Sequence, residues 1–338
     1  MTEFTDEIPD EAEELTDRAF EVLNAGDLEG AEILASRLRD LSYSSYFEIQ
    51  ALVHLDREEP ELALEVLKQG VEEAPFVWRL WQLLGNTLSD AGDFEDAMRC
   101  YESALQFDLD AEDTASLQFN RATLLSRIGH NDEALALLNE SGDLIMSAPL
   151  GLQWRAEALR LSILADLGQR TEVIERADAL ESLLSQATED SVESLAVVLI
   201  QGGFALLTCG ENLRAHKWAQ RALYWERTNG DALQLLRQSD VTAPIAARYF
   251  QVVLEGDWND EAESEELSFI KTFMVVARGV EEAEILALEM ESSHWETTLV
   301  RVMESEDCGE CDETSAGVYE ASPYHLYPRS QRDEVEEI

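Results

Sequence analysis

The sequence predicts a mostly α-helical protein, in which an α-solenoid of about six helical hairpins is followed by a small α+β domain. Three observations lead to this prediction. A helical pattern returns about every 34 residues over much of the chain. Small residues recur at matching places in these units. After Pro244, runs rich in β-branched and aromatic residues replace the helical pattern.

The clearest unit runs from Trp78 to Ala111 and reads WRLWQLLGNTLSDAGDFEDAMRCYESALQFDLDA. Its large residues fall at helical spacing. Two antiparallel helices can approach closely only where both carry small residues, and Gly85 and Ala97 supply such a notch. The pair Gly92-Asp93 supplies the turn. One hairpin cannot bury its apolar face alone, so the units are expected to stack on one another.

This unit resembles the tetratricopeptide repeat, which has a period of about 34 residues. Only the proline that is usual near repeat position 32 is missing, and Leu109 stands there. Related units begin near Ala12, Ser44, Ala115, Trp154 and Ala196. The unit at Trp154 fits less well, and the segment Asp231 to Gln238 is expected to cap the last hairpin. A plain helical bundle, the alternative, predicts neither the period nor the recurrent small residues.

The chain after Pro244 is expected to form a small α+β domain of order ββαβ(β). Its predicted elements are the strands Arg248–Trp258, Phe269–Arg278 and Thr297–Met303, the helix Val280–Ser292, and a fourth strand within Gly317–Tyr327. The domain boundaries follow: 1–240 for the solenoid with its capping helix, 245–328 for the α+β domain, and 329–338 for an acidic tail.

Acidic residues dominate the composition, with 71 Asp and Glu against 24 Lys and Arg and a formal net charge of −47. Only three of the basic residues are lysines, at positions 68, 217 and 271. Such a surface resembles those of proteins from salt-accumulating archaea and bacteria; an acidic protein from a GC-rich mesophile is the alternative. No basic stripe exists to bind nucleic acid or an anionic membrane. The N-terminus has no signal-peptide pattern, so a cytoplasmic location is expected.

Cys308-Gly309-Glu310-Cys311 is a CxxC pair, which can supply half of a zinc site or exchange disulfides. A structural zinc needs two more ligands, and no second pair is present. The acidic surroundings would raise a thiol pKa, which disfavours redox chemistry. Unconstrained loop cysteines are therefore the favoured interpretation, and Cys308 and Cys311 stay weak metal candidates. No catalytic or cofactor-binding motif appears, so we expect no enzyme activity and no cofactor.

The tetratricopeptide resemblance implies that the first helix of each hairpin lines a concave groove. It assigns to this groove eight residues: Arg79, Gln82, Asn86, Phe119, Thr123, Arg127, Arg155 and Ser162. Asn86 matches the asparagine with which family members hold a peptide backbone or carboxylate. The lysines that clamp chaperone tails are absent. In the alternative, the arginines pair with neighbouring acidic residues and bind nothing.

The sequence thus favours an interaction scaffold that binds an unidentified protein or peptide in the groove, without catalysis of its own. One alternative is a metal-binding or catalytic C-terminal module that the helices target. Another is a structural protein that self-assembles through its repeat ends. Fold alone does not decide between them.

Overall fold

The computed structural model describes residues 10–184, 192–240, 247–259, 266–292, 297–311 and 315–331. Contacts within the chain divide it into two compact units, Met1–Leu152 and Gln153–Ile338. The predicted acidic tail lies largely outside the described residues, which end in a short 3-10 helix, η2 (Arg329–Gln331).

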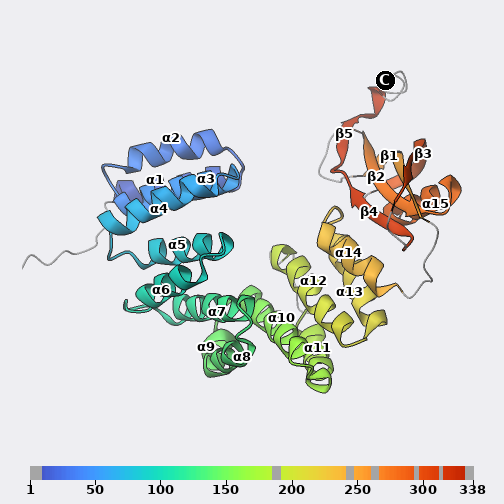
Figure 1. Cartoon of the computed structure of the whole chain (residues 1–338). Helices are drawn as coiled ribbons and strands as arrows, with labels where there is room; N and C mark the ends of the chain where they lie inside the picture. The colour runs from blue at the N-terminus through green and yellow to red at the C-terminus, as the bar shows by residue number, and fades with distance from the viewer. Residues whose placement is uncertain are drawn as a thin grey trace, which may run out of the picture. The chain divides into compact units, whose positions relative to one another are not determined.

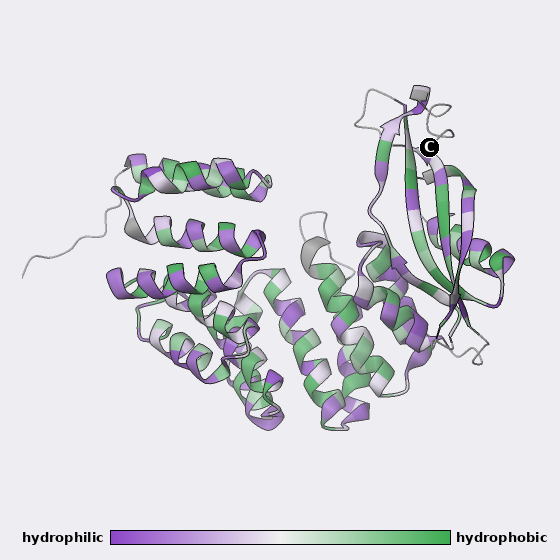
Figure 2. Cartoon of the chain, turned by 45° about the horizontal axis from the view of Figure 1, so that its top comes forward, coloured by the Kyte–Doolittle hydropathy of each residue, from purple (hydrophilic) through white to green (hydrophobic). Residues whose placement is uncertain are grey.

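The first unit is a succession of antiparallel helices (Figure 1). They are α1 (Asp10–Asn24), α2 (Leu28–Leu38), α3 (Tyr43–Asp56), α4 (Pro60–Glu73), α5 (Trp78–Asp90), α6 (Phe94–Ala104), α7 (Ala111–Arg127), α8 (Asn131–Glu140) and α9 (Gly142–Ser147). The predicted helical hairpins are confirmed. Most of these helices carry both hydrophobic and hydrophilic residues, as Figure 2 shows, because one side packs on its neighbours and the other meets water.

A glycine in the left-handed conformation ends the first helix of several hairpins. Gly92 has a φ of +85°, and the adjacent Asp93 N–H donates to the Leu88 carbonyl at 2.9 Å. Only glycine adopts this conformation without strain from a side chain, which explains why it recurs at the turn. Gly26, Gly129, Gly168 and Gly210 have φ values of +77°, +78°, +70° and +77°.

The predicted notch of small residues is present between α5 and α6. A Cβ atom placed on Gly85 would lie 2.6 Å from Cε1 of Tyr101, which is closer than real Cβ atoms come to their neighbours. Ala97 on α6 is completely buried. The large side chains of this hairpin, Leu84, Leu88 and Tyr101, belong to one apolar cluster that continues into α3, α4 and α7. Each hairpin therefore completes the core of the next one.

The helices of the second unit are α10 (Leu150–Asp166), α11 (Arg170–Leu184), α12 (Val192–Thr208), α13 (Asn212–Trp225) and α14 (Gly230–Ser239); α10 begins at the end of the first unit. Gly202 and Gly203 on α12 sit against the side chains of Trp218 and Leu235, which leave no room for a Cβ. Leu235 belongs to α14, the predicted capping helix. This helix packs on α12 and α13 and also contacts the sheet described next.

The rest of the second unit is an antiparallel sheet with one helix. Its elements are β1 (Arg248–Trp258), β2 (Leu267–Ala277), α15 (Val280–Ser292), β3 (Thr297–Glu310), β4 (Gly317–Ala321) and β5 (His325–Pro328). The strand order is β3-β1-β2-β4, and β5 also pairs with β2. The predicted order ββαβ(β) is confirmed. We call this part of the second unit the sheet module.

The second strand was predicted as Phe269–Arg278 and is observed as Leu267–Ala277, and two further strands differ more from the prediction. The third strand was expected to end at Met303, but β3 continues to Glu310 because β1 pairs with it as far as Arg248. The acidic sequence after Met303 did not suggest a strand. The pairing of β3 with β1 nevertheless continues there, with several register shifts along its length. The fourth predicted strand is divided into β4 and β5, with Pro323 between them.

One face of the sheet carries the apolar residues Phe250, Val252, Leu254 and Phe273, which are buried. Helix α15 packs on the sheet, and its fully buried residues are Ala283, Ala287 and Glu291. Within the described residues, no helix combines the length and the apolar character needed to cross a lipid bilayer.

Candidate functional site

The structure places six of the eight predicted groove residues on α5 and α7 of the first unit. Arg79 and Arg127 are exposed, and Gln82, Asn86 and Thr123 are half-buried. Phe119 is only 6% exposed, so its side chain belongs to the interior of the repeats. The last two residues, Arg155 and Ser162, lie on α10 in the second unit.

Asn86 is held by residues from two other helices. Its Oδ1 accepts a hydrogen bond from the Tyr101 hydroxyl at 2.9 Å and another from Nδ2 of Asn120 at 3.1 Å. Tyr101 is on α6 and Asn120 is on α7, so the asparagine joins its own hairpin to the next. Burial raises the Tyr101 pKa, so this hydroxyl remains a donor at neutral pH.

The side chain of Asn120 was not among the predicted groove residues. Among the described residues, Nδ2 of Asn86 and Oδ1 of Asn120 have no hydrogen-bond partner. An asparagine side chain can donate two hydrogen bonds and accept two. The pair can therefore still donate and accept hydrogen bonds, as is needed to pair with the C=O and N–H groups of a peptide backbone.

Arg127 pairs with the preceding hairpin. Its Nη1 lies 2.9 Å from Ser89 Oγ and 2.9 Å from Asp90 Oδ1, and its guanidinium lies 5.7 Å from the centre of the Phe94 ring. These contacts agree with the alternative in which arginines pair with neighbouring acids. The side chain is 42% exposed, so this pair adds little to stability.

Arg79 acts on carboxylates of the two neighbouring first helices. Burial raises the pKa of Glu48 on α3, and the positive charge of Arg79 opposes this rise. Burial also raises the pKa of Asp113 on α7, again against the effect of Arg79. The guanidinium itself lies 5.5 Å from the centre of the Trp78 ring. The positive charge of Arg79 thus lies near the carboxylates of Glu48 and Asp113, on the first helices of the neighbouring hairpins.

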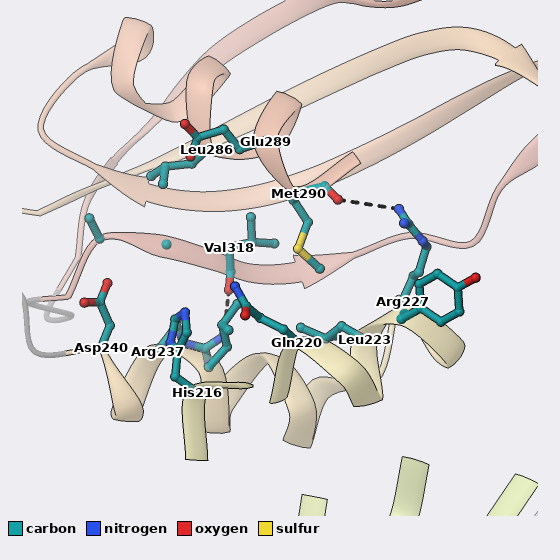
Figure 3. A pocket seen from close by; sticks show the side chains of 14 residues that line it. His216, Gln220, Leu223, Arg227, Arg237, Asp240, Leu286, Glu289, Met290 and Val318 are labelled. Atoms are coloured by element: carbon teal, nitrogen blue, oxygen red, sulfur yellow. Dashed lines mark hydrogen bonds between the residues drawn. The ribbon is translucent and has the colours of Figure 1, made fainter. Parts of the chain in front are cut away.

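A pocket that the sequence did not predict lies in the second unit, where helices α13 and α14 meet the sheet module (Figure 3). Its volume is about 370 Å³. His216, Gln220 and Leu223 come from α13, and Leu286, Glu289 and Met290 come from α15. The walls are mainly apolar with charged groups among them, and the volume falls at the lower end of small-molecule sites.

Arg227, in the turn between α13 and α14, connects these helices to the sheet module. Its Nη1 lies 3.3 Å from the Tyr324 hydroxyl, 3.5 Å from the Met290 carbonyl and 3.5 Å from Oε2 of Glu291. Figure 3 shows the guanidinium directed at Met290. On α14, Arg237 donates to the Val318 carbonyl at 2.8 Å and lies 3.8 Å from the centre of the Tyr319 ring.

Lys271 and Glu291 form an ion pair in the interior of the sheet module. Lys271 Nζ lies 3.4 Å from Glu291 Oε2 and 4.0 Å from the centre of the Tyr324 ring, and the Tyr324 hydroxyl donates to Oε1 of Glu291 at 2.7 Å. Burial lowers the Lys271 pKa to about 8, although the charge of Glu291 opposes this shift. We call Arg227, Lys271, Glu291 and Tyr324 the ionic cluster.

The only sequence signal for this cluster was a lysine inside the apolar run FIKTFMVV. Its partners come from residues 227, 291 and 324, so the grouping depends on the fold. The fold therefore decided both the pocket and the ionic cluster, which share Arg227.

Cys308 and Cys311 lie at the end of β3, where the prediction had a loop. Cys308 is exposed on the strand, Cys311 follows it, and neither forms a disulfide. Between them Gly309 has a φ of +114°. In the part of the chain that the structure describes, no group of three His, Cys, Asp or Glu residues is placed to hold a metal ion.

Residues 10–122 match the family model of the ChAPs, the Chs5p-Arf1p-binding proteins. Among solved structures, PilF of Pseudomonas aeruginosa is similar at 16% identity and a TM-score of 0.50, over 67% of this chain and 96% of that chain. PilW, a type IV pilus biogenesis factor, has 14% identity and a TM-score of 0.52, over 68% of this chain and 99% of that one.

The APC/C hetero-tetramer Cut9-Hcn1 is similar at 10% identity and a TM-score of 0.52, over 68% of this chain and 46% of that chain. No curated protein sequence matches the chain. At such low identities these likenesses concern the fold alone. The chain is a tetratricopeptide-like helical array that ends in an antiparallel sheet.

Proposed function

We propose that this protein is an interaction adaptor without catalysis of its own, which binds an extended segment of a partner protein along the first helices of its repeats. The observation that carries the proposal is the pair Asn86 and Asn120. Hydrogen bonds from Tyr101 and between the two amides fix the pair across two hairpins, while Nδ2 of Asn86 and Oδ1 of Asn120 have no hydrogen-bond partner among the described residues.

This arrangement suits the backbone of an extended peptide. Each residue of such a segment carries one N–H and one C=O, and burying them without partners is costly. A preorganised donor and acceptor reduce this cost, since the amides lose little further freedom on binding. The half-buried Gln82 and Thr123 extend the polar row on the same helices.

The family-model match supports the proposal, because the matched ChAPs are named as Arf1p-binding proteins and the match spans α1 to most of α7. In the proposed complex, the Asn86–Asn120 pair recognises the backbone of the partner segment, and Gln82 and Thr123 contact its neighbouring residues.

Site-specific crosslinking tests the proposal. A photo-reactive benzoyl-phenylalanine is introduced at Gln82, at Thr123 or, as a control, at the exposed Glu133 on the second helix α8. We expect one partner to be crosslinked from the first two positions and not from Glu133. Adding Asn86→Ala should abolish the adduct while the circular dichroism spectrum is unchanged. Equal adducts from Glu133, or an adduct that survives Asn86→Ala, would contradict the proposal.

We also propose that the protein works in a salty cytoplasm and binds neither nucleic acid nor membranes. The support is its net charge of −47, since molar salt reduces the Debye length to roughly 3 Å and removes most repulsion between exposed charges. The melting temperature is therefore expected to rise between 0.1 and 2 M KCl. A melting temperature that stays constant or falls would oppose this proposal.

A further inference from the structure

Within the described residues, the outer edge of β3 has no partner strand. β3 stands at the end of the sheet order and has 14 residues, and within the described residues it pairs only with β1. In an antiparallel pair about every second residue points its backbone N–H and C=O away from its partner strand. Such an edge can accept a further strand.

The register with β1 assigns the side chains of β3 to two faces. Glu304 pairs with Val253 and Glu306 with Gln251, so both glutamates lie on the face opposite to Val252 and Leu254. Both are exposed, and among the described residues neither carboxylate has a hydrogen-bond or ion-pair partner. Arg301 lies on the same face, but its guanidinium contacts the buried Glu255 at 2.6 Å. This face of the edge is therefore acidic.

Helix α15 flanks β3 on the other face. The Ser305 hydroxyl donates to Oε1 of Glu284 at 2.8 Å. Leu299, near the start of β3, is 79% exposed. A strand added to β3 would thus find the apolar side chain of Leu299 as well as carboxylates along the edge.

The charges decide which strand can be added. A second copy of β3 would bring glutamates opposite glutamates, and like charges in opposite positions destabilise a strand pair. The net charge of −47 adds a general repulsion between copies. A strand with arginine or lysine at alternate positions would instead pair its cations with Glu304 and Glu306.

We infer that the outer edge of β3 binds an extended, basic segment of a partner protein by strand addition. Backbone hydrogen bonds to β3 hold the segment, and Glu304 and Glu306 select its charge. This site is distinct from the Asn86–Asn120 pair, which lies in the other unit. If the charges only protected the edge from pairing, β3 would bind no strand at all.

Fluorescence anisotropy with the full chain tests the inference. The probe is a labelled, end-blocked seven-residue peptide that alternates arginine and valine. A matched peptide with proline at its central position keeps most of the charge but cannot continue the ladder. We expect the proline peptide to bind at least about tenfold more weakly, since backbone pairing would be interrupted.

Two double variants separate the β3 edge from general acidity. Glu304→Gln with Glu306→Gln should weaken binding about tenfold, because two charge-assisted contacts are lost. Glu95→Gln with Glu112→Gln removes the same charge from exposed positions on α6 and α7 and should leave binding unchanged. Glu304→Arg with Glu306→Arg should transfer binding to a peptide that alternates glutamate and valine.

Three results would overturn the inference. They are equal binding of the proline peptide, equal loss in the Glu95 and Glu112 control, and no binding of the arginine peptide. The control pair distinguishes the specific edge from attraction to any part of the acidic surface. These results test the β3 edge independently of the binding proposed at Asn86.

Discussion

The helical repeats and the sheet module stabilise themselves in different ways. The core of the hairpins around Leu84 and Tyr101 consists of apolar side chains that meet at small residues, and charged pairs such as Arg99–Glu95 stay exposed. In the sheet module, Glu255, Lys271 and Glu291 are at most 1% exposed. The repeats of the first unit thus keep charge in water, whereas the sheet module places charge in its interior.

This difference predicts that substituting a buried charged residue reduces stability more than substituting an exposed one. A buried ion has lost its hydration, so it depends on its partners, and removing one partner leaves the other unpaired. An exposed ion can turn to water instead. The number of ion pairs is therefore a poor guide to stability in this protein, and their burial is a better one.

The largest effect is expected for Glu291→Ala, which leaves Lys271 and Arg227 buried without their shared carboxylate. The sheet module should lose about 3–5 kcal/mol of stability. Hydrogen exchange of the β1 and β2 amides measures this loss in the full chain. The control is Glu289→Ala, at an exposed position of the same helix. If both variants exchange at the same rate, the ionic cluster does not hold the module.

The second effect concerns close packing in the repeats. Gly85→Ala would bring a Cβ to 2.6 Å from Tyr101, so α5 and α6 must separate. Overpacking of this kind costs about 1–3 kcal/mol. The melting temperature reports it, with Gly142→Ala as control because a Cβ placed on Gly142 would meet no atom within 4 Å. A Gly85→Ala protein as stable as the wild type would show that the notch is not needed.

The third effect is a pH dependence. The Lys271 pKa falls from its ordinary value of 10.5 to about 8 in the folded protein, so above pH 8 the unfolded chain binds more protons than the folded one. Stability should therefore rise with pH, by about 1 kcal/mol between pH 7 and 9. The measurement is the difference in unfolding free energy between wild type and Lys271→Met at each pH. A difference that is constant over this range would contradict the shift.

The smallest effect is expected for Arg99→Ala. Arg99 pairs with Glu95 and Asp96 on the surface of α6, and its side chain is 63% exposed. Such pairs contribute less than about 0.5 kcal/mol. Urea unfolding should give nearly the same midpoint as for the wild type. A loss comparable with that of Glu291→Ala would remove the contrast between surface and buried charge.

The candidate sites could be predicted only in part. The position of Asn86 on a first helix followed from the repeat register, but its hydrogen bond with Asn120 depends on how α5 and α7 are rotated against each other. The same rotation buries Phe119, which the register had assigned to the groove. The pocket could not be foreseen, because α13, α14, α15 and β4 contribute to it from distant parts of the chain.

The sequence by itself determined the helical hairpins, their turns at glycine, and the order of strands and helix after Pro244. These features depend on local spacing and on the shape of single residues such as Gly85 and Gly92, so they can be recognised without the fold. Only the tertiary structure decided that β3 continues to Glu310 and that Lys271 meets Glu291. Pairing and burial bring together residues far apart in the chain, and no local pattern records which distant group will neutralise a buried charge.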